Sequence, residues 1–224
     1  MVGQKASDKV GECICILEEL YGLPEVDEID PVDLLVRTIL SQNTSDINSL
    51  RAFASLKRAY GDYESLLSTR AEEVAESIRE GGLAEIKARR IQEALLRIKS
   101  DRGAIEIGFL RGMEKEAAMS YLLSLPGVGP KTASIVLLFA FGMPFMPVDT
   151  HVFRVSQRLG LVAPGLSPEK AQKALEEIVP PERYSSFHLN LISHGRLVCR
   201  ARGPKCEECA LQGCCDFFLQ GQKP

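Results

Sequence analysis

Apolar residues recur at three- and four-residue spacing along almost the whole chain of 224 residues. Alternating runs of β-branched residues between hairpin turns are missing, so the pattern predicts an all-α fold. Ser7 and Asp8 are suited to cap a first helix that ends near Tyr21, and Asp33 a second that ends at Leu40. Further helices are predicted near 46–60, 62–68, 71–79, 84–99, 114–124, 130–141, 151–159, 168–178 and 183–198.

No apolar run is long enough to cross a membrane, because the longest, 135–141, is far shorter than the roughly 18 residues that a spanning helix needs. The N-terminus lacks the apolar centre of a secretory signal, so an intracellular, reducing setting is expected. The net charge is -3, but residues 1–36 hold nine acidic side chains against two lysines. The remainder is therefore basic, which permits a face for an anionic ligand, although a basic run is more often a solvated helix face.

The segment 125–133 (LPGVGPKTA) joins two apolar helices. Its two glycines let backbone amides approach a ligand closely, and Pro130 suits the first turn of a helix. Amides at a helix N-terminus form an anion site. A tight turn without a ligand is the ordinary alternative, and the consensus of a nucleotide-binding phosphate loop is not present.

This segment, followed by 148–154 (VDTHVFR), resembles the helix-hairpin-helix and Gly/Pro-Asp signature of the endonuclease III family. The resemblance continues through 40–46 (LSQNTSD), 82–88 (GLAEIKA) and the C-terminal cysteines, so it covers nearly the whole chain. It implies two all-α domains around a DNA-binding cleft. The expected domains are a six-helix barrel with the hairpin over 31–144, and a cluster domain that joins 1–30 to 145–224.

The resemblance implies a DNA glycosylase that also cleaves abasic sites. Lys131 would be the nucleophile and Asp149, eighteen positions later, would assist it. The amides of Gly127, Val128 and Gly129 would hold a DNA phosphate. Attack on the sugar C1′ needs a neutral amine, and a Schiff base then permits β-elimination of the 3′ phosphate. The ordinary alternatives are a solvated lysine in a first helical turn and an aspartate that only caps the next helix.

A glycosylase must flip its target base out of the duplex and fill the gap. By the resemblance, Gln42 or Asn43 fills the vacancy and Leu83 wedges between bases. The family glutamine corresponds to Asn43, and Gln42 lies one residue earlier, so both stay candidates. The departure of 40–46 from the family's LSAQATD leaves the range of lesions open. The chain's three histidines, His151, His188 and His194, are too scattered for a metal site and are interpreted as polar contacts.

Five of the seven cysteines lie between Cys199 and Cys215, which favours a metal centre over disulfides. Cys13 and Cys15 stand apart and are interpreted as small buried apolar residues. Zinc also accepts four thiolates. The spacing of four of the clustered cysteines resembles the endonuclease III cluster loop and implies a [4Fe–4S] cluster on Cys199, Cys206, Cys209 and Cys215, leaving out Cys214. Between the first two ligands, the loop would present cations to the DNA backbone from Arg200, Arg202 and Lys205.

The expected partner is double-stranded DNA containing a damaged base, such as an oxidised pyrimidine, or an abasic site. A rival is a mismatch glycosylase for thymine, uracil or adenine, which Lys131 disfavours because monofunctional relatives usually lack that lysine. The chain is also too short for the extra C-terminal domain of the adenine branch. A second rival is a non-catalytic DNA-binding or redox-sensing iron–sulfur protein, against which Lys131 with Asp149 also argues. A monomer in the cytoplasm, on the nucleoid in a prokaryote, is expected.

Overall fold

The computed structural model describes residues 2–24 and 28–221. These residues form helices, turns and loops with no strand, which confirms the predicted all-α class. The chain divides into two compact units, Glu28–Met143 and Met1–Asp27 with Pro144–Pro224. Among the described helices, none combines the length and the apolar character that a membrane span requires.

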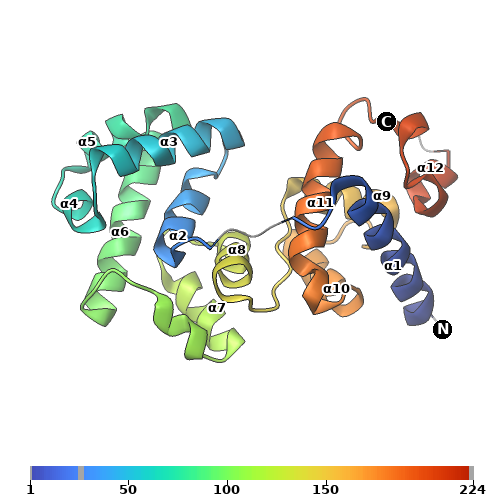
Figure 1. The fold of residues 1–224 in the computed structure, drawn as a ribbon, viewed down its shortest axis with the longest axis horizontal. Helices are drawn as coiled ribbons and strands as arrows, with labels where there is room; N and C mark the ends of the chain where they lie inside the picture. Colours follow the sequence, from blue (N-terminus) through green and yellow to red (C-terminus); the bar gives the residue numbers. More distant parts are fainter. Residues whose placement is uncertain (1, 25–27, 222–224) are drawn as a thin grey trace. The chain divides into compact units, whose positions relative to one another are not determined.

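The unit Glu28–Met143 is built around helices α2, α6 and α8 (Figure 1). Its core contains fully buried leucines and isoleucines from these helices, such as Leu35, Ile91 and Leu137. Burial of these apolar side chains is the main contribution to its stability. Its elements are α2 (Pro31–Leu40), α3 (Asp46–Ala59), α4 (Tyr63–Leu67), α5 (Ala71–Ser77), η1 (Arg79–Gly81), α6 (Ala84–Arg102), η2 (Gly108–Gly112), α7 (Lys115–Ser124) and α8 (Pro130–Phe141).

The second unit combines the first helix of the chain with its C-terminal part. Helix α1 packs against α11, and α11 packs against α9, so residues far apart in sequence share one core (Figure 1). Leu17 of α1 and Leu191 of α11 are both fully buried. The elements are α1 (Val2–Tyr21), α9 (Thr150–Leu159), α10 (Pro168–Ile178), η3 (Pro181–Arg183), α11 (Tyr184–Leu197), η4 (Cys206–Glu208), η5 (Gln212–Cys214) and α12 (Asp216–Leu219).

Two predicted helix caps are wrong. Helix α2 is capped by Asp30, whose side chain accepts hydrogen bonds from the amides of Val32 and Asp33. Asp33 lies inside the first turn and accepts hydrogen bonds from Lys57 and Tyr63 instead. Pro31 explains the shift, since proline is favoured at the first helical position. Helix α1 begins at Val2, so the predicted caps at residues 7 and 8 lie within it.

The two isolated cysteines differ in their surroundings. Cys13 is fully buried, as predicted, and its Sγ lies 3.4 Å from the Sγ of Cys214. Cys15 is exposed, so the prediction of burial is wrong for this residue. Two residues along a helix place side chains about 200° apart, and only one of them can face the core.

Candidate functional site

The loop between α7 and α8 forms a tight hairpin. Leu125 and Val128 anchor it because both side chains are buried, and the amide of Val128 donates to the carbonyl oxygen of Leu125 at 3.2 Å. Gly127 has a φ of +77°, which glycine adopts without a steric penalty. A Cβ added there would lie 2.8 Å from Cδ of Arg90. The hairpin therefore requires glycine at this position for two independent reasons.

The hairpin presents unpaired backbone amides at the start of α8. Within the described chain, the amides of Gly127 and Gly129 donate no hydrogen bond, whereas that of Val128 is used by Leu125. Gly129 is the N-cap and no side chain caps the helix. The first-turn amides of Lys131 and Thr132 have no acceptor within the helix, and this end carries the positive pole of the helix dipole. The geometry suits an anion such as phosphate.

Lys131 is the second residue of α8, directly after Pro130. Its side chain is exposed and forms no ion pair in the part of the chain that the structure describes. A cation in the first turn opposes the helix dipole, so it gains nothing locally from this position. The amine of Lys131 thus lies exposed beside a turn whose unpaired amides suit an anion.

Gln42 is bound to the hairpin. Its Nε2 donates to the carbonyl oxygen of Gly127 at 3.0 Å and to Oγ1 of Thr132 at 3.3 Å. Its Oε1 accepts a hydrogen bond of 3.3 Å from Nη1 of Arg90. Arg90 was not predicted as a site residue from the sequence. Its one signal was its place on the predicted helix 84–99, seven residues after Leu83.

Asn43 and Leu83 are both exposed, and the backbone of each has a positive φ. Asn43 has a φ of +53°, and its side-chain amide forms no hydrogen bond within the described residues. Leu83 has a φ of +51° as the N-cap of α6, and 52% of its surface is exposed. Left-handed conformations are uncommon for a leucine and are typical of functional sites. Both side chains are free to contact a ligand.

Asp149 caps helix α9. Its Oδ1 accepts hydrogen bonds of 2.8 Å and 2.7 Å from the amides of His151 and Val152. Both bonds use the same oxygen, which leaves Oδ2 without a donor among the described residues. The cap that was weighed as the ordinary alternative is therefore present, and the second oxygen stays available for other chemistry. Lys131 and Asp149 belong to different units, so their pairing stays a prediction.

The three histidines make the polar contacts that were predicted. His188 Nδ1 lies 2.9 Å from the carbonyl oxygen of Pro147, and His194 Nδ1 lies 3.1 Å from the hydroxyl of Tyr21. His151 Nδ1 lies 3.2 Å from Nη2 of Arg154. Burial lowers the pKa of His151 below its usual value, and the charge of Arg154 lowers it further. His151 is therefore neutral at physiological pH.

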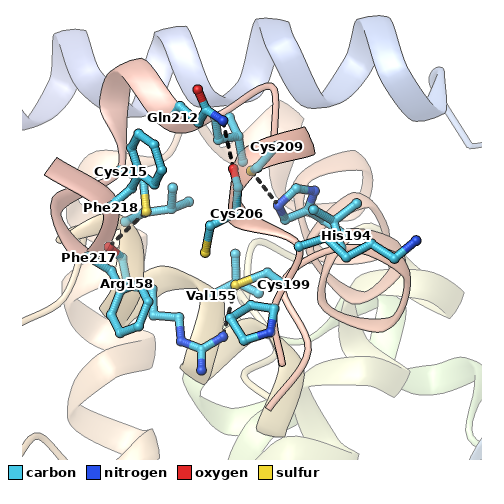
Figure 2. Close-up of a pocket in the computed structure, with 15 residues that line it drawn as sticks. Val155, Arg158, His194, Cys199, Cys206, Cys209, Gln212, Cys215, Phe217 and Phe218 are labelled. Atoms are coloured by element: carbon cyan, nitrogen blue, oxygen red, sulfur yellow. Dashed lines mark hydrogen bonds between the residues drawn. The ribbon is translucent and has the colours of Figure 1, made fainter. Parts of the chain in front are cut away.

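Four cysteines line one pocket, as Figure 2 shows. They come from the loop after α11, from η4, and from the segment before α12. Cys214 points elsewhere and contacts Cys13. The walls are apolar, with side chains from α9 and α12 such as Val155 and Phe218. The thiols that line the cavity are those of Cys199, Cys206, Cys209 and Cys215.

Burial disfavours the thiolate forms of Cys209 and Cys215. Burial, together with the neighbouring cysteines, raises the pKa of Cys209 to about 11, against a backbone hydrogen bond from Leu211 that lowers it. Four thiolates would therefore need a cationic centre between them. Among the described residues, no group of three or more His, Cys, Asp or Glu side chains is arranged to hold a metal ion. Four soft sulfur donors are the ligand set that structural zinc and iron–sulfur clusters both use.

Two basic side chains contact the cysteine cavity. Nη1 of Arg158 donates to Sγ of Cys199 at 3.3 Å, and its guanidinium lies 4.9 Å from the ring centroid of Phe217. Nε2 of His194 lies 3.5 Å from Sγ of Cys209 (Figure 2). If the four cysteines held a metal centre, hydrogen bonds of this kind to its sulfurs would tune that centre. Neither residue was singled out from the sequence as a neighbour of the cysteines, because they precede the cysteine-rich segment on other helices.

The loop between the first two cysteines carries three exposed cations, Arg200, Arg202 and Lys205. Arg200 donates from Nε to the carbonyl oxygen of Arg196 at 3.3 Å. Lys205 lies 3.9 Å from Glu208, and a weak exposed pair of this kind leaves the amine accessible. The loop thus presents positive charge to solvent beside the cavity.

Residues 36–181 match the family model described as HhH-GPD superfamily base excision DNA repair protein. The chain is 36% identical to endonuclease III of Thermotoga maritima, over 88% of this chain and 87% of that one. It is 37% identical to endonuclease III of Bacillus subtilis, over 94% and 92%. The fold also matches a solved non-covalent endonuclease III–DNA complex, with a TM-score of 0.84, 31% identity, and coverage of 96% of this chain and 97% of that one. A thermostable thymine-DNA glycosylase matches with a TM-score of 0.77, 25% identity, and coverage of 95% and 98%.

Proposed function

The chain belongs to the HhH-GPD superfamily of base excision DNA repair proteins, and we propose that it is a DNA glycosylase with abasic-site lyase activity of the endonuclease III type. The observation that carries the proposal is the placement of Lys131. It is an exposed lysine in the first turn of an uncapped helix, directly after a glycine hairpin that leaves amides unpaired. The substrate class is double-stranded DNA with a damaged base, such as an oxidised pyrimidine, or an abasic site.

The amides of the hairpin bind a phosphate of the substrate strand and hold its sugar beside Lys131. The neutral amine attacks C1′, a bond forms between Nζ and C1′, and the base departs with a proton. Ring opening gives a Schiff base. Removal of a proton from C2′ then expels the 3′ phosphate by β-elimination. Asp149 stabilises the positive charge that develops on the sugar, through the carboxylate oxygen that its helix cap does not use.

Asn43 fills the space that the extruded base leaves, because its side-chain amide is free, whereas that of Gln42 is bound to the hairpin. Leu83 wedges between neighbouring bases, as an exposed apolar side chain can do. Gln42 with Arg90 supports the hairpin instead of contacting the lesion.

Cys199, Cys206, Cys209 and Cys215 are the proposed ligands of a [4Fe–4S] cluster. When bound, the cluster would supply the positive centre that four neighbouring thiolates require, and it would hold the loop that precedes Cys206 in one conformation. Arg200, Arg202 and Lys205 then bind backbone phosphates. These contacts position the DNA, and they carry no sequence information.

Borohydride trapping tests the proposal. Wild-type protein incubated with duplex DNA that contains an abasic site should give a covalent adduct, and Lys131→Ala should give none. Lys170→Ala is the matched control, since Lys170 is also exposed in the first turn of a helix that begins with proline. An undiminished adduct in Lys131→Ala would refute the assignment.

A mismatch glycosylase is the second candidate, favoured by the match to the thymine-DNA glycosylase. Duplexes with thymine glycol, uracil, mismatched thymine, mismatched adenine or an abasic site separate the candidates by their relative rates of cleavage. We expect a monomeric enzyme in the cytoplasm, on the nucleoid in a prokaryote.

A further inference from the structure

Lys87 of α6 is a lysine with no access to solvent. Only 1% of its surface is exposed, and its Nζ donates to the carbonyl oxygen of Leu40 at 2.7 Å and to that of Gly81 at 2.8 Å. It forms no ion pair within the described residues, and burial lowers the pKa of its amine. Placing a cation here is costly, because burial penalises the charged form and no carboxylate among the described residues compensates it.

The two carbonyl groups that Lys87 binds mark the ends of two helical segments. Leu40 is the last residue of α2, and Gly81 is the last residue of η1. The C-terminal end of a helix carries partial negative charge on unpaired carbonyls, which a cation neutralises. The buried ammonium therefore replaces water at both helix ends.

The same two segments lead directly into Asn43 and Leu83. Asn43 follows Leu40 by three residues, and Leu83 follows Gly81 by two. In the described chain these are the two non-glycine residues with positive φ. Such conformations persist only where the surrounding structure imposes them.

The backbone of Lys87 also contacts the turn that bears Leu83. Its amide donates to the carbonyl oxygen of Leu83 at 3.0 Å, in the first turn of α6. One residue thus binds the backbone at the end of α2, at the end of η1 and at Leu83 itself. Few arrangements of the two turns satisfy all three hydrogen bonds together.

We infer that Lys87 is a positioning residue that sets the distance between the turn bearing Asn43 and the turn bearing Leu83, so that both side chains enter the duplex at one lesion. The inference rests on the proposed function, in which Asn43 fills the vacancy and Leu83 wedges beside it. Both side chains can act at one lesion only if the two turns keep a fixed separation, because misplacement of a side chain by about 1 Å can lower the rate about 100-fold.

Lys87→Met tests the inference on two substrates. Cleavage of an abasic site in a duplex, which needs both turns, should fall by between about 10- and 100-fold. Cleavage of the same site in a single strand, which has no stacked duplex to wedge apart and no vacancy opposite a base to fill, should stay within about twofold. Lys57→Met is the control, since Lys57 pairs with Asp33 in the same unit and its amine donates no hydrogen bond to either turn among the described residues. Equal losses on the two substrates would show a general structural role and overturn the inference.

Hydrogen–deuterium exchange of the free protein provides a readout that does not depend on activity. In Lys87→Met, exchange should rise in 41–44 and 82–84 together, and Lys57→Met should change neither. Exchange that stays unchanged in either turn would overturn the inference. If Lys87→Met does not fold, Lys87→Gln replaces it, since glutamine keeps donors but cannot reach both carbonyls. If wild-type protein cleaves neither substrate, the proposed function fails, and exchange alone decides the role of Lys87.

Discussion

Gln42 donates a hydrogen bond from Nε2 to the carbonyl oxygen of Gly127, 3.0 Å away and 85 residues further along the chain. With Arg90 as donor to its Oε1, the whole amide group of Gln42 is bonded within the protein. The next residue, Asn43, forms no side-chain hydrogen bond among the described residues. Adjacent amides thus have different surroundings, and the supporting role proposed for Gln42 and the lesion-contacting role proposed for Asn43 rest on this difference.

Gln42→Ala should lower the free energy of unfolding by about 1–2 kcal/mol, because the partly buried carbonyl of Gly127 and the hydroxyl of Thr132 lose their donor. Asn43→Gly should change it by less than about 0.5 kcal/mol, since glycine adopts the positive φ freely. Excision from a duplex should nevertheless fall in Asn43→Gly. Urea unfolding and single-turnover excision measure both quantities. A large loss of stability in Asn43→Gly would contradict the separation of roles.

Gly127→Ala should destabilise the protein by about 1–3 kcal/mol, because alanine is strained at a φ of +77° and its Cβ would collide with Arg90. The dissociation constant for duplex DNA should rise as well. Gly61→Ala is the matched control, since a Cβ at Gly61 meets no atom within 4 Å and its φ is not positive. Thermal unfolding and DNA titration check the pair, and equal effects in both variants would remove the special role of Gly127.

Asp149 has two proposed tasks that one pair of substitutions separates. Asp149→Asn keeps an oxygen that can cap α9, so the free energy of unfolding should change little, while the rate of adduct formation falls because the negative charge is lost. Asp149→Ala should lower the rate of adduct formation as well, and it should also lower the free energy of unfolding by about 1 kcal/mol. Single-turnover trapping and urea unfolding measure the two. Full activity in Asp149→Asn would restrict this residue to capping.

Removal of iron tests the cysteine cavity. Purified protein should show the visible absorption of an iron–sulfur cluster, and Cys209→Ser should reduce both the iron content and the melting temperature. Cys15→Ser is the control because that thiol is exposed and does not line the cavity. A colourless protein that contains zinc would refute the cluster.

The histidine at the start of α9 predicts a dependence of stability on pH. Burial holds the folded pKa of His151 below the usual value of 6.5. The unfolded chain therefore binds a proton at a higher pH than the folded protein does. The stability from this group is complete above about pH 6.5 and falls as the pH drops toward the folded pKa.

The difference in unfolding free energy between wild type and His151→Gln should accordingly shrink from about pH 7.5 to about pH 5. Urea unfolding at a series of pH values measures it. A difference that stays constant with pH would contradict a lowered pKa.

The helices follow from the sequence because their signals are local. The spacing of apolar residues and the proline and glycine positions predicted helices close to α6, α8 and α9, and the aspartate before α9 is the cap that was weighed. The caps of the first two helices were wrong because neighbouring residues compete for such positions. Local sequence signals do not decide which of several neighbouring residues becomes the N-cap.

The sequence by itself determined the all-α class, the family, and the candidates Lys131, Asp149 and the four cysteines, since these rest on residue types at fixed spacing. Only the tertiary structure decided which of two adjacent amides is free, that Arg90 closes over Gly127, and that Lys87 is buried between two helix ends. These features depend on contacts between segments far apart in the chain. The packing of helices determines which side chains meet. The spacing of residues along one helix does not predict which residues of another helix lie opposite them.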